Sequence, residues 1–179
     1  MSAINTTPTP PVSLIDIASY LPGPPVGADY FARYARSDRM AHNIMFRAPT
    51  HRHHIGVGET AVDMAEHAIA PLIARQGTAA IAGVDVLITH TQLPDLPVLG
   101  CGADLARRMG MSPQCILDIH NGGCAAFVYM IDLARTILST SDAHTALIVA
   151  VQNSAGQIFT QPGVRPLAQA AVPGDGCGV

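Results

Sequence analysis

The sequence predicts an α/β fold, a layered (αβα) domain around a mainly parallel sheet, and two patterns carry this prediction. Continuous apolar runs at residues 84–89, 115–119 and 146–151 are typical of short strands that are buried on both faces. Segments with the apolar spacing of helices lie between these runs. Strands that alternate with helices along a chain form parallel sheets, and the helices cover the faces of those sheets.

The first part of the chain is less regular. Residues 1–11 are rich in Thr and Pro and are expected to form a flexible lead-in, so that one domain occupies residues 12–179. Within this domain, residues 12–20 alternate enough to predict a strand, and residues 28–36 predict a short helix. Residues 40–58 are rich in His and Arg and predict an irregular surface or pocket loop.

The later elements have clearer boundaries. Thr60 is suited to cap a long helix, and Gly77 is suited to end it. A Pro-rich loop leads to a helix at residues 103–109, and a Gly-Gly turn leads to a strong helix at residues 124–139. Residues 154–173 predict a loop with room for a short helix. The last six residues then predict a Gly-rich turn that enters another strand.

The composition excludes several classes of protein. A net charge of -3 lacks the basic footprint of a nucleic-acid-binding protein. No apolar run reaches the roughly 20 residues that span a bilayer, and the first residues do not resemble a secretory signal. The four cysteines lack CxxC spacing, which predicts reduced thiols in a cytoplasmic protein. No metal site is expected, because His51, His53 and His54 have no matching cluster of Cys, Asp or Glu.

Cys124 is the candidate for chemistry. It follows a strand and the pair Gly122 and Gly123, and it opens the next helix. The N-terminus of a helix has free N–H groups and the positive end of the helix dipole, which favour a thiolate and an oxyanion. The alternative is a small buried side chain, the commoner state of a free cysteine. The residues alone leave both interpretations open.

The surroundings of Cys124 resemble the active-cysteine region of the ketosynthase III family (beta-ketoacyl-carrier-protein synthase III) of the thiolase superfamily. That family has an Asp-Val/Ile strand followed by Cys-Ala-Gly-Phe, and this chain has Asp118-Ile119 and then Cys124-Ala125-Ala126-Phe127. The resemblance extends over about residues 12–179. Its further segments are a diverged Arg-Thr-Gly-Ile-x-x-Arg-His segment, an apolar strand and a Gly-Asp-Gly-Ala-Gly turn, at residues 46–55, 146–151 and 174–178.

The resemblance implies a thiolase-like fold and an acyltransferase. Cys124 would take an acyl group from a thioester of coenzyme A or of an acyl carrier protein, and its backbone N–H would help to hold the oxyanion. The acyl-cysteine would then pass the group to a second substrate, with no cofactor besides these thioesters. The family is dimeric, so a homodimer is expected. Its His and Asn or Asp partners lie in the C-terminal half of the fold, which is expected to be absent from these residues.

The resemblance also suggests substrate-binding residues: Asn43, Arg47, Arg52, Leu96, Gly122 and Gly123. Arg47 or Arg52 would contact a coenzyme A phosphate, Asn43 stands near the place of a stacking aromatic, and Leu96 would reach into a partner subunit. Ala48-Pro49 replaces the family's Thr-Gly, and Ala126 replaces a Gly. These departures favour specialised metabolism, such as polyketide synthesis, over the start of fatty-acid synthesis. The alternative function is a non-catalytic ketosynthase-like subunit of a heterodimer.

Overall fold

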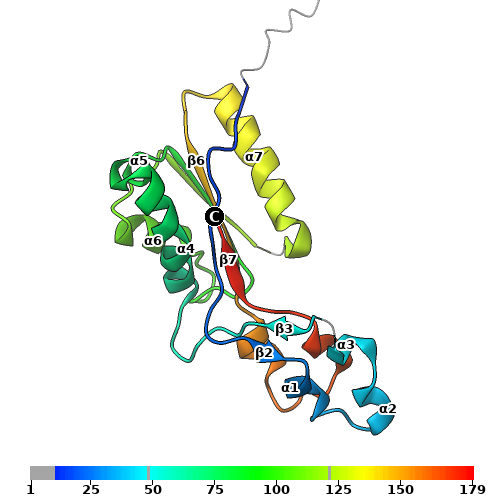
Figure 1. The fold of residues 1–179 in the computed structure, drawn as a ribbon. Helices are drawn as coiled ribbons and strands as arrows, with labels where there is room; N and C mark the ends of the chain where they lie inside the picture. Colours follow the sequence, from blue (N-terminus) through cyan, green and yellow to red (C-terminus); the bar gives the residue numbers. More distant parts are fainter. Residues whose placement is uncertain (1–10, 48, 121) are drawn as a thin grey trace, which may run out of the picture.

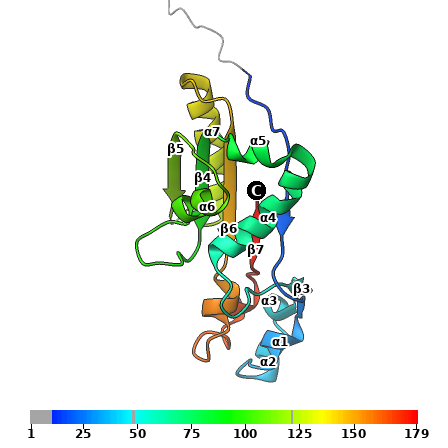
Figure 2. The ribbon, with the colours of Figure 1, turned by 90° about the vertical axis from the view of Figure 1, so that its left-hand side faces the viewer.

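A five-stranded sheet with helices on both faces makes up most of the molecule, and a small lobe extends from one end of this sheet (Figure 1). The computed structural model describes residues 11–47, 49–120 and 122–179. The predicted lead-in therefore lies outside the described residues, apart from Pro11. Helices α4, α5 and α6 cover one face of the sheet and α7 covers the other (Figures 1 and 2).

The centre of the sheet is parallel, as predicted. Strand β4 (Val86–Thr91) pairs in parallel with β5 (Cys115–Ile119) on one side and β6 (Ala146–Gln152) on the other. Side chains of β4 alternate between two apolar clusters: Leu87 packs toward α4 and α6, whereas Val86 and Ile88 pack toward α7. A strand buried on both faces reads as a continuous apolar run, which explains the prediction at residues 84–89.

Strand β5 lies at the edge of this sheet, and it is less buried than its apolar sequence predicts. The strand order is β1-β7-β6-β4-β5, so β5 has a partner on one side only among the described residues. Its side chains are half-buried, and Ile116 is 36% exposed. Composition alone does not separate a central strand from an edge strand.

The predicted strand at residues 12–20 is wrong for most of its length. Among the described residues, β1 (Ser19–Tyr20) pairs antiparallel to β7 (Gly176–Gly178), which is in turn antiparallel to β6. Ala18 and Val179 continue this pairing with two backbone hydrogen bonds, at 3.0 and 2.9 Å. Asp16 is held instead by the side chains of Arg75 and Gln76, at 2.9 Å.

Helix α4 (Ala61–Gln76) has the predicted boundaries. The Thr60 hydroxyl accepts from the Asp63 N–H at 3.0 Å, and the Asp63 carboxylate accepts from the Thr60 N–H at 2.9 Å, which together form a capping box. Gly77 ends the helix with φ of +85°. The other helices of this layer are α5 (Thr78–Ala82) and α6 (Gly102–Arg108), and α6 replaces the predicted helix at residues 103–109.

Helix α7 (Ala126–Thr140) packs alone on its face of the sheet, through Ala126, Met130 and Ala134. It begins two residues later than predicted, because a 3-10 turn at Gly123–Ala125 comes first. The apolar side chains exposed at its start are Phe127, Val128, Tyr129 and Ile131.

The small lobe forms at the carboxyl end of the parallel strands. Its core consists of Phe31, Phe46, Ala170 and Ala171. The lobe contains more order than the predicted loops at residues 40–58 and 154–173. Its elements are β2 (Val26–Gly27), α1 (Asp29–Ala32), α2 (Asp38–Ala41), α3 (Ile44–Arg47), β3 (His51–Arg52), a π-helical turn (Ala155–Phe159) and a 3-10 turn (Ala168–Ala171).

Candidate active site

The turn between β5 and α7 exposes Cys124 at the carboxyl edge of the sheet. Gly123 has φ of +53°, a left-handed conformation that favours glycine. A Cβ on Gly122 would lie 2.7 Å from the Cβ of Ala126 and 2.9 Å from its Cα. One glycine is therefore required by backbone conformation, and the other by close contact with the first residue of α7.

The other three cysteines have different surroundings. Cys101 and Cys177 are buried, and burial raises the pKa of the Cys101 thiol to about 11 and that of Cys177 to about 12. Both are therefore packing residues. Cys115, by contrast, is only half-buried, at the amino end of β5. Cys124 is thus the exposed thiol of the four, and all four are free.

Asp118 connects β5 to its neighbours close to this turn. Its Oδ1 accepts a hydrogen bond from the Thr89 hydroxyl of β4 and another from the Gly102 N–H at the start of α6, the latter at 2.9 Å. A side chain on Gly100 would overlap the Asp118 carboxylate. Asp118 therefore fixes the end of β5, from which the Cys124 turn departs.

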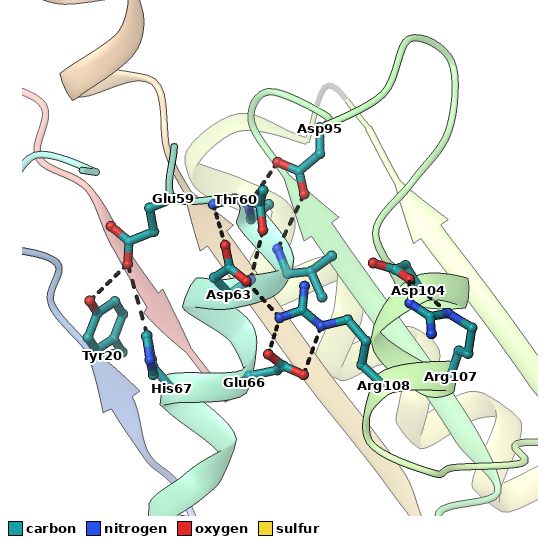
Figure 3. Close-up of polar contacts among 12 residues, drawn as sticks. Tyr20, Glu59, Thr60, Asp63, Glu66, His67, Asp95, Asp104, Arg107 and Arg108 are labelled. Atoms are coloured by element: carbon teal, nitrogen blue, oxygen red, sulfur yellow. Dashed lines mark hydrogen bonds and ion pairs between the residues drawn. The ribbon is translucent and has the colours of Figure 1, made fainter. Parts of the chain in front are cut away.

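The loop that contains Leu96 is anchored at two points. Asp95 accepts from the N–H groups of Ala61 and Val62, at 2.8 and 3.3 Å, so it caps α4 from a loop 34 residues away in sequence (Figure 3). The buried Asn153 side chain accepts from the Leu93 N–H at 2.9 Å and donates to the Leu93 carbonyl at 2.8 Å. Between these anchors and α6, Leu96 is 60% exposed.

Asn43, Arg47 and Arg52 all lie in the small lobe, but in different environments. Asn43 and Arg47 are exposed around α3, and the Asn43 side chain accepts from the Met45 N–H at 2.9 Å. Arg52 is only 3% exposed, and its guanidinium lies 5.3 Å from the centre of the Phe31 ring and donates to the Pro49 carbonyl at 2.7 Å. Burial lowers the pKa of Arg52.

Six predicted site residues thus fall into two groups. Gly122, Gly123 and Cys124 form one turn, whereas in the lobe Asn43 precedes α3, Arg47 ends α3 and Arg52 lies on β3. Among the hydrogen bonds and ion pairs of the described residues, none joins the lobe residues to the Cys124 turn. A hollow of about 230 Å³ lies beside that turn, lined by Thr91, Gln92, Pro94, Val98 and His120.

Sequence reasoning missed Asp175 as a structural centre of this edge. Its buried carboxylate accepts from the N–H groups of Ile55, Ala155 and Gly156, at 2.8, 2.7 and 2.7 Å. It therefore joins the segment after β3, the segment after β6 and the start of β7. The Gly-Asp-Gly motif was the available signal, because it places a carboxylate between glycines that allow close backbone approach.

His90 was also missed. It lies near the carboxyl end of β4 on the face covered by α7, since its neighbour in the alternation, Ile88, packs there. The side chain is buried, and its Nε2 has no hydrogen-bond partner among the described residues. Burial, and then the neighbouring His120, lower the pKa of His90.

The described residues contain neither a metal-binding cluster nor a membrane-spanning helix. No group of three or more His, Cys, Asp or Glu side chains in ranges 11–47, 49–120 and 122–179 is arranged to hold a metal ion. Within the same ranges, every helix is too short or too polar to cross a bilayer.

The curated proteins that this chain resembles share one name. No family model matches the chain. It is 29% identical over 101 residues to a beta-ketoacyl-[acyl-carrier-protein] synthase III from Rhodospirillum centenum, and 30% identical over 103 residues to one from Nitratidesulfovibrio vulgaris strain DP4. Each match covers 56% of this chain, and 31% and 30% of the respective relative.

Solved structures extend the match to nearly the whole chain. A crystal structure of a 3-oxoacyl-(acyl-carrier-protein) synthase III is 28% identical, with a TM-score of 0.71 over 91% of this chain and 47% of that one. The chain resembles ketosynthase III proteins in sequence and has their thiolase-like fold. Its fold is also that of the Thermus thermophilus synthase III, with a TM-score of 0.75 at 24% identity, over 90% of this chain and 48% of that one. OleA from Xanthomonas campestris shares the fold, with a TM-score of 0.71 at 18% identity, over 90% of this chain and 55% of that one.

The ketosynthase III-like assignment confirms the predicted fold class. The described sheet, with its parallel centre and helices on both faces, corresponds to about half of each synthase III structure named above. The roles of Cys124 and of the binding residues stay predictions.

Proposed function

We propose that this ketosynthase III-like protein is an acyltransferase in which Cys124 forms an acyl-cysteine intermediate. The observation that carries the proposal is the position of this thiol: it is the exposed cysteine of the chain, in a glycine turn at the N-terminus of a 15-residue helix. Its curated relatives are named beta-ketoacyl-[acyl-carrier-protein] synthases III, which supports a thioester as the acyl donor.

The first step is acyl transfer from sulfur to sulfur. The Cys124 thiolate attacks the thioester carbonyl, and negative charge develops on the carbonyl oxygen. The Cys124 N–H at the mouth of α7 would donate to that oxyanion, helped by the helix dipole. Collapse of the tetrahedral adduct breaks the donor's carbon–sulfur bond and releases a pantetheine thiol, which takes up the proton lost by Cys124. No cofactor is needed.

In the second step, the acyl group passes to an acceptor and Cys124 is released as a thiolate. We propose a carbanion from a malonyl thioester, or an oxygen or nitrogen nucleophile, as the acceptor. The His with an Asn or Asp that would prepare it is assigned to the C-terminal half of the fold. That half would cover the apolar start of α7, where Phe127, Val128 and Tyr129 are more than half exposed.

Substrate contacts are proposed at both ends of the donor. Gly123, where a Cβ would meet no atom within 4 Å, leaves room for the acyl chain beside Cys124, and Gly122 supports the turn by its close contact with Ala126. Arg47, which is exposed at the end of α3, is suited to a phosphate of coenzyme A, with Asn43 nearby. Arg52 would contribute to this binding by holding the lobe from within, because its guanidinium is buried against Phe31.

We also propose a homodimer that forms along the free edge of β5. The strand presents unpaired backbone groups and the exposed Ile116, and such an edge is a template for pairing with another strand. Apolar side chains of the adjacent loop add to this surface: Leu96, Val98 and Leu99. A second copy of this chain would pair with the backbone groups of β5 and cover the apolar side chains of the loop.

Mass spectrometry of the full-length protein tests the role of Cys124. After incubation with acyl-coenzyme A or acyl carrier protein, an acyl mass is expected on the peptide that contains Cys124. The adduct should be absent from Cys124→Ala and present in the control Cys115→Ala, because Cys115 is half-buried at the other end of β5. An adduct that persists in Cys124→Ala would contradict the proposal. No adduct from any thioester would favour the non-catalytic subunit.

A further inference from the structure

The hollow beside the Cys124 turn is small and has a mostly polar lining. Its volume of about 230 Å³ is below the roughly 300 Å³ at which typical ligand pockets begin. Its polar lining residues are Thr91, Gln92 and His120, and its apolar ones are Pro94 and Val98. Neither a lysine, an arginine nor a carboxylate lines it. The hollow therefore offers hydrogen-bond donors and acceptors without a permanent charge.

Thr91 and His120 lie at the carboxyl ends of two neighbouring strands. Strands β4 and β5 pair in parallel up to the residues directly before these two. Because side chains alternate along a strand, Thr91 and His120 share the face of the residues two positions earlier. Those residues are Thr89 and Asp118, which are hydrogen-bonded to each other. Both polar side chains thus lie on one face of the sheet, and His120 is four positions before Cys124.

The Thr91 hydroxyl has no partner in this arrangement. Thr91 is 3% exposed, and its Oγ1 is buried and makes no hydrogen bond with the described residues. Thr89, on the same face of β4, donates to Asp118 instead. An unpaired buried hydroxyl is costly, and native structures rarely keep one without a reason. A polar group bound in the hollow would give this hydroxyl its missing hydrogen bond.

We propose that the hollow holds the acyl group of the donor thioester and selects a short acyl chain with an uncharged polar group, such as a hydroxyl. The inference rests on the proposed function, in which Cys124 takes up this acyl group, and it names the class of the group. The small volume of the hollow restricts the chain to a few carbons.

Hydrogen bonding favours a hydroxyl over the two other kinds of acyl chain. A hydroxyl both donates and accepts, so it can pair with Thr91, Gln92 and His120. An apolar chain would leave the Thr91 hydroxyl unpaired, and sites that bind a substrate hydroxyl discriminate strongly against analogues without it. A carboxylate would be buried without a lysine or arginine partner, which is costly for a charge.

Binding of matched thioesters to the full-length Cys124→Ala protein tests the inference without requiring acylation. The probes are 3-hydroxybutyryl-, butyryl- and succinyl-pantetheine, whose acyl groups have the same number of carbons. We expect the hydroxylated thioester to bind about tenfold more tightly than the other two, which corresponds to one added neutral hydrogen bond. Isothermal titration calorimetry measures the three Kd values.

Variants in the same background identify the group responsible. Thr91→Val removes the hydroxyl but keeps the shape of the side chain, so the preference should disappear, whereas Thr91→Ser should retain it. The control is Thr136→Val, an exposed position on α7 whose hydroxyl donates to the Asp132 carbonyl at 2.8 Å; it should leave the preference unchanged. Equal Kd values for the hydroxylated and butyryl thioesters would overturn the inference. So would tighter binding of the succinyl thioester, a preference that survives Thr91→Val, or no binding of any probe.

Acylation of the unaltered protein separates this inference from the proposed function. If the hydroxylated and butyryl thioesters acylate Cys124 at equal rates and bind equally, the inference fails and the proposed function stands. If the hydroxylated thioester binds more tightly but no thioester acylates Cys124, the proposed function fails and the polar selectivity of the hollow is confirmed.

Discussion

At the scale of single residues, burial distinguishes side chains of the same type. Cys101 and Cys177 are held as thiols by burial, which raises the pKa of each by disfavouring the charged form. Cys124 is exposed at the start of a helix. Arg47 and Arg52, which are five positions apart, differ in the same way. Arg47 is exposed, whereas Arg52 is buried inside the lobe. The sequence supplies the side chains, and their surroundings decide their chemistry.

Asp175 gives a prediction at this scale. Asp175→Asn removes the charge that three backbone N–H groups share, and it directs an amide donor toward some of them. We expect the free energy of unfolding to fall by about 3 kcal/mol, since bonds to a buried charged group are strong and unpaired N–H groups are costly. Denaturant unfolding of the full-length protein measures this.

The control for this change is Asp132→Asn, an exposed position on α7 whose carboxylate accepts no hydrogen bond from the described residues. Its unfolding curve should match that of the unaltered protein. Equal stability of the two variants would show that the Asp175 carboxylate does not hold the carboxyl edge together.

At the scale of elements, local signals predicted some boundaries and not others. Thr60, Asp63 and Gly77 set the ends of α4 through contacts within four residues, so the sequence was sufficient. The start of α7 was predicted two residues early, because a positive φ at Gly123 and a 3-10 turn delay the helix. The strand at residues 12–20 failed for a different reason: its pairing depends on a partner strand, β7, that is remote in sequence.

The turn before α7 gives the prediction at this scale. Gly123→Ala meets no atom within 4 Å, so its cost is conformational, about 1–2 kcal/mol for a left-handed residue. We expect the turn to shift and the acylation rate of Cys124 to fall by roughly tenfold to a hundredfold, because misplacement of a reacting group is costly. Single-turnover labelling of the full-length protein measures that rate.

Gly163→Ala is the matched control, since its Cβ also meets no atom within 4 Å and its φ is not in the left-handed range. It should acylate at the unaltered rate. An unchanged rate in Gly123→Ala would show that acylation of Cys124 does not depend on the geometry of this turn.

At the scale of the whole molecule, the sheet has two different edges. On the β1 side, short antiparallel strands and the segment around Asp16 close the sheet. On the β5 side, the edge is open and apolar among the described residues. The proposed dimer uses the open edge, which lies away from the small lobe at the carboxyl end of the strands (Figure 2).

Oligomeric state tests the open edge. Ile116→Arg places a charge on β5 and should shift the full-length protein from dimer to monomer in light scattering coupled to size exclusion. Ile158→Arg is the control, because Ile158 is 37% exposed, close to the 36% of Ile116, but lies in the lobe. A dimer that persists in Ile116→Arg, or dissociates equally in both variants, would place the interface elsewhere.

The sequence by itself determined the α/β class, the parallel centre of the sheet, the boundaries of α4 and the candidate nucleophile Cys124. These depend on apolar periodicity, capping residues and a glycine turn, which act over a few neighbouring positions. Only the tertiary structure decided that β5 is an edge, that Arg52 is buried and that Asp175 joins three segments. Those properties arise where segments that are remote in sequence pack together, and a local sequence pattern does not indicate which remote segments will be in contact.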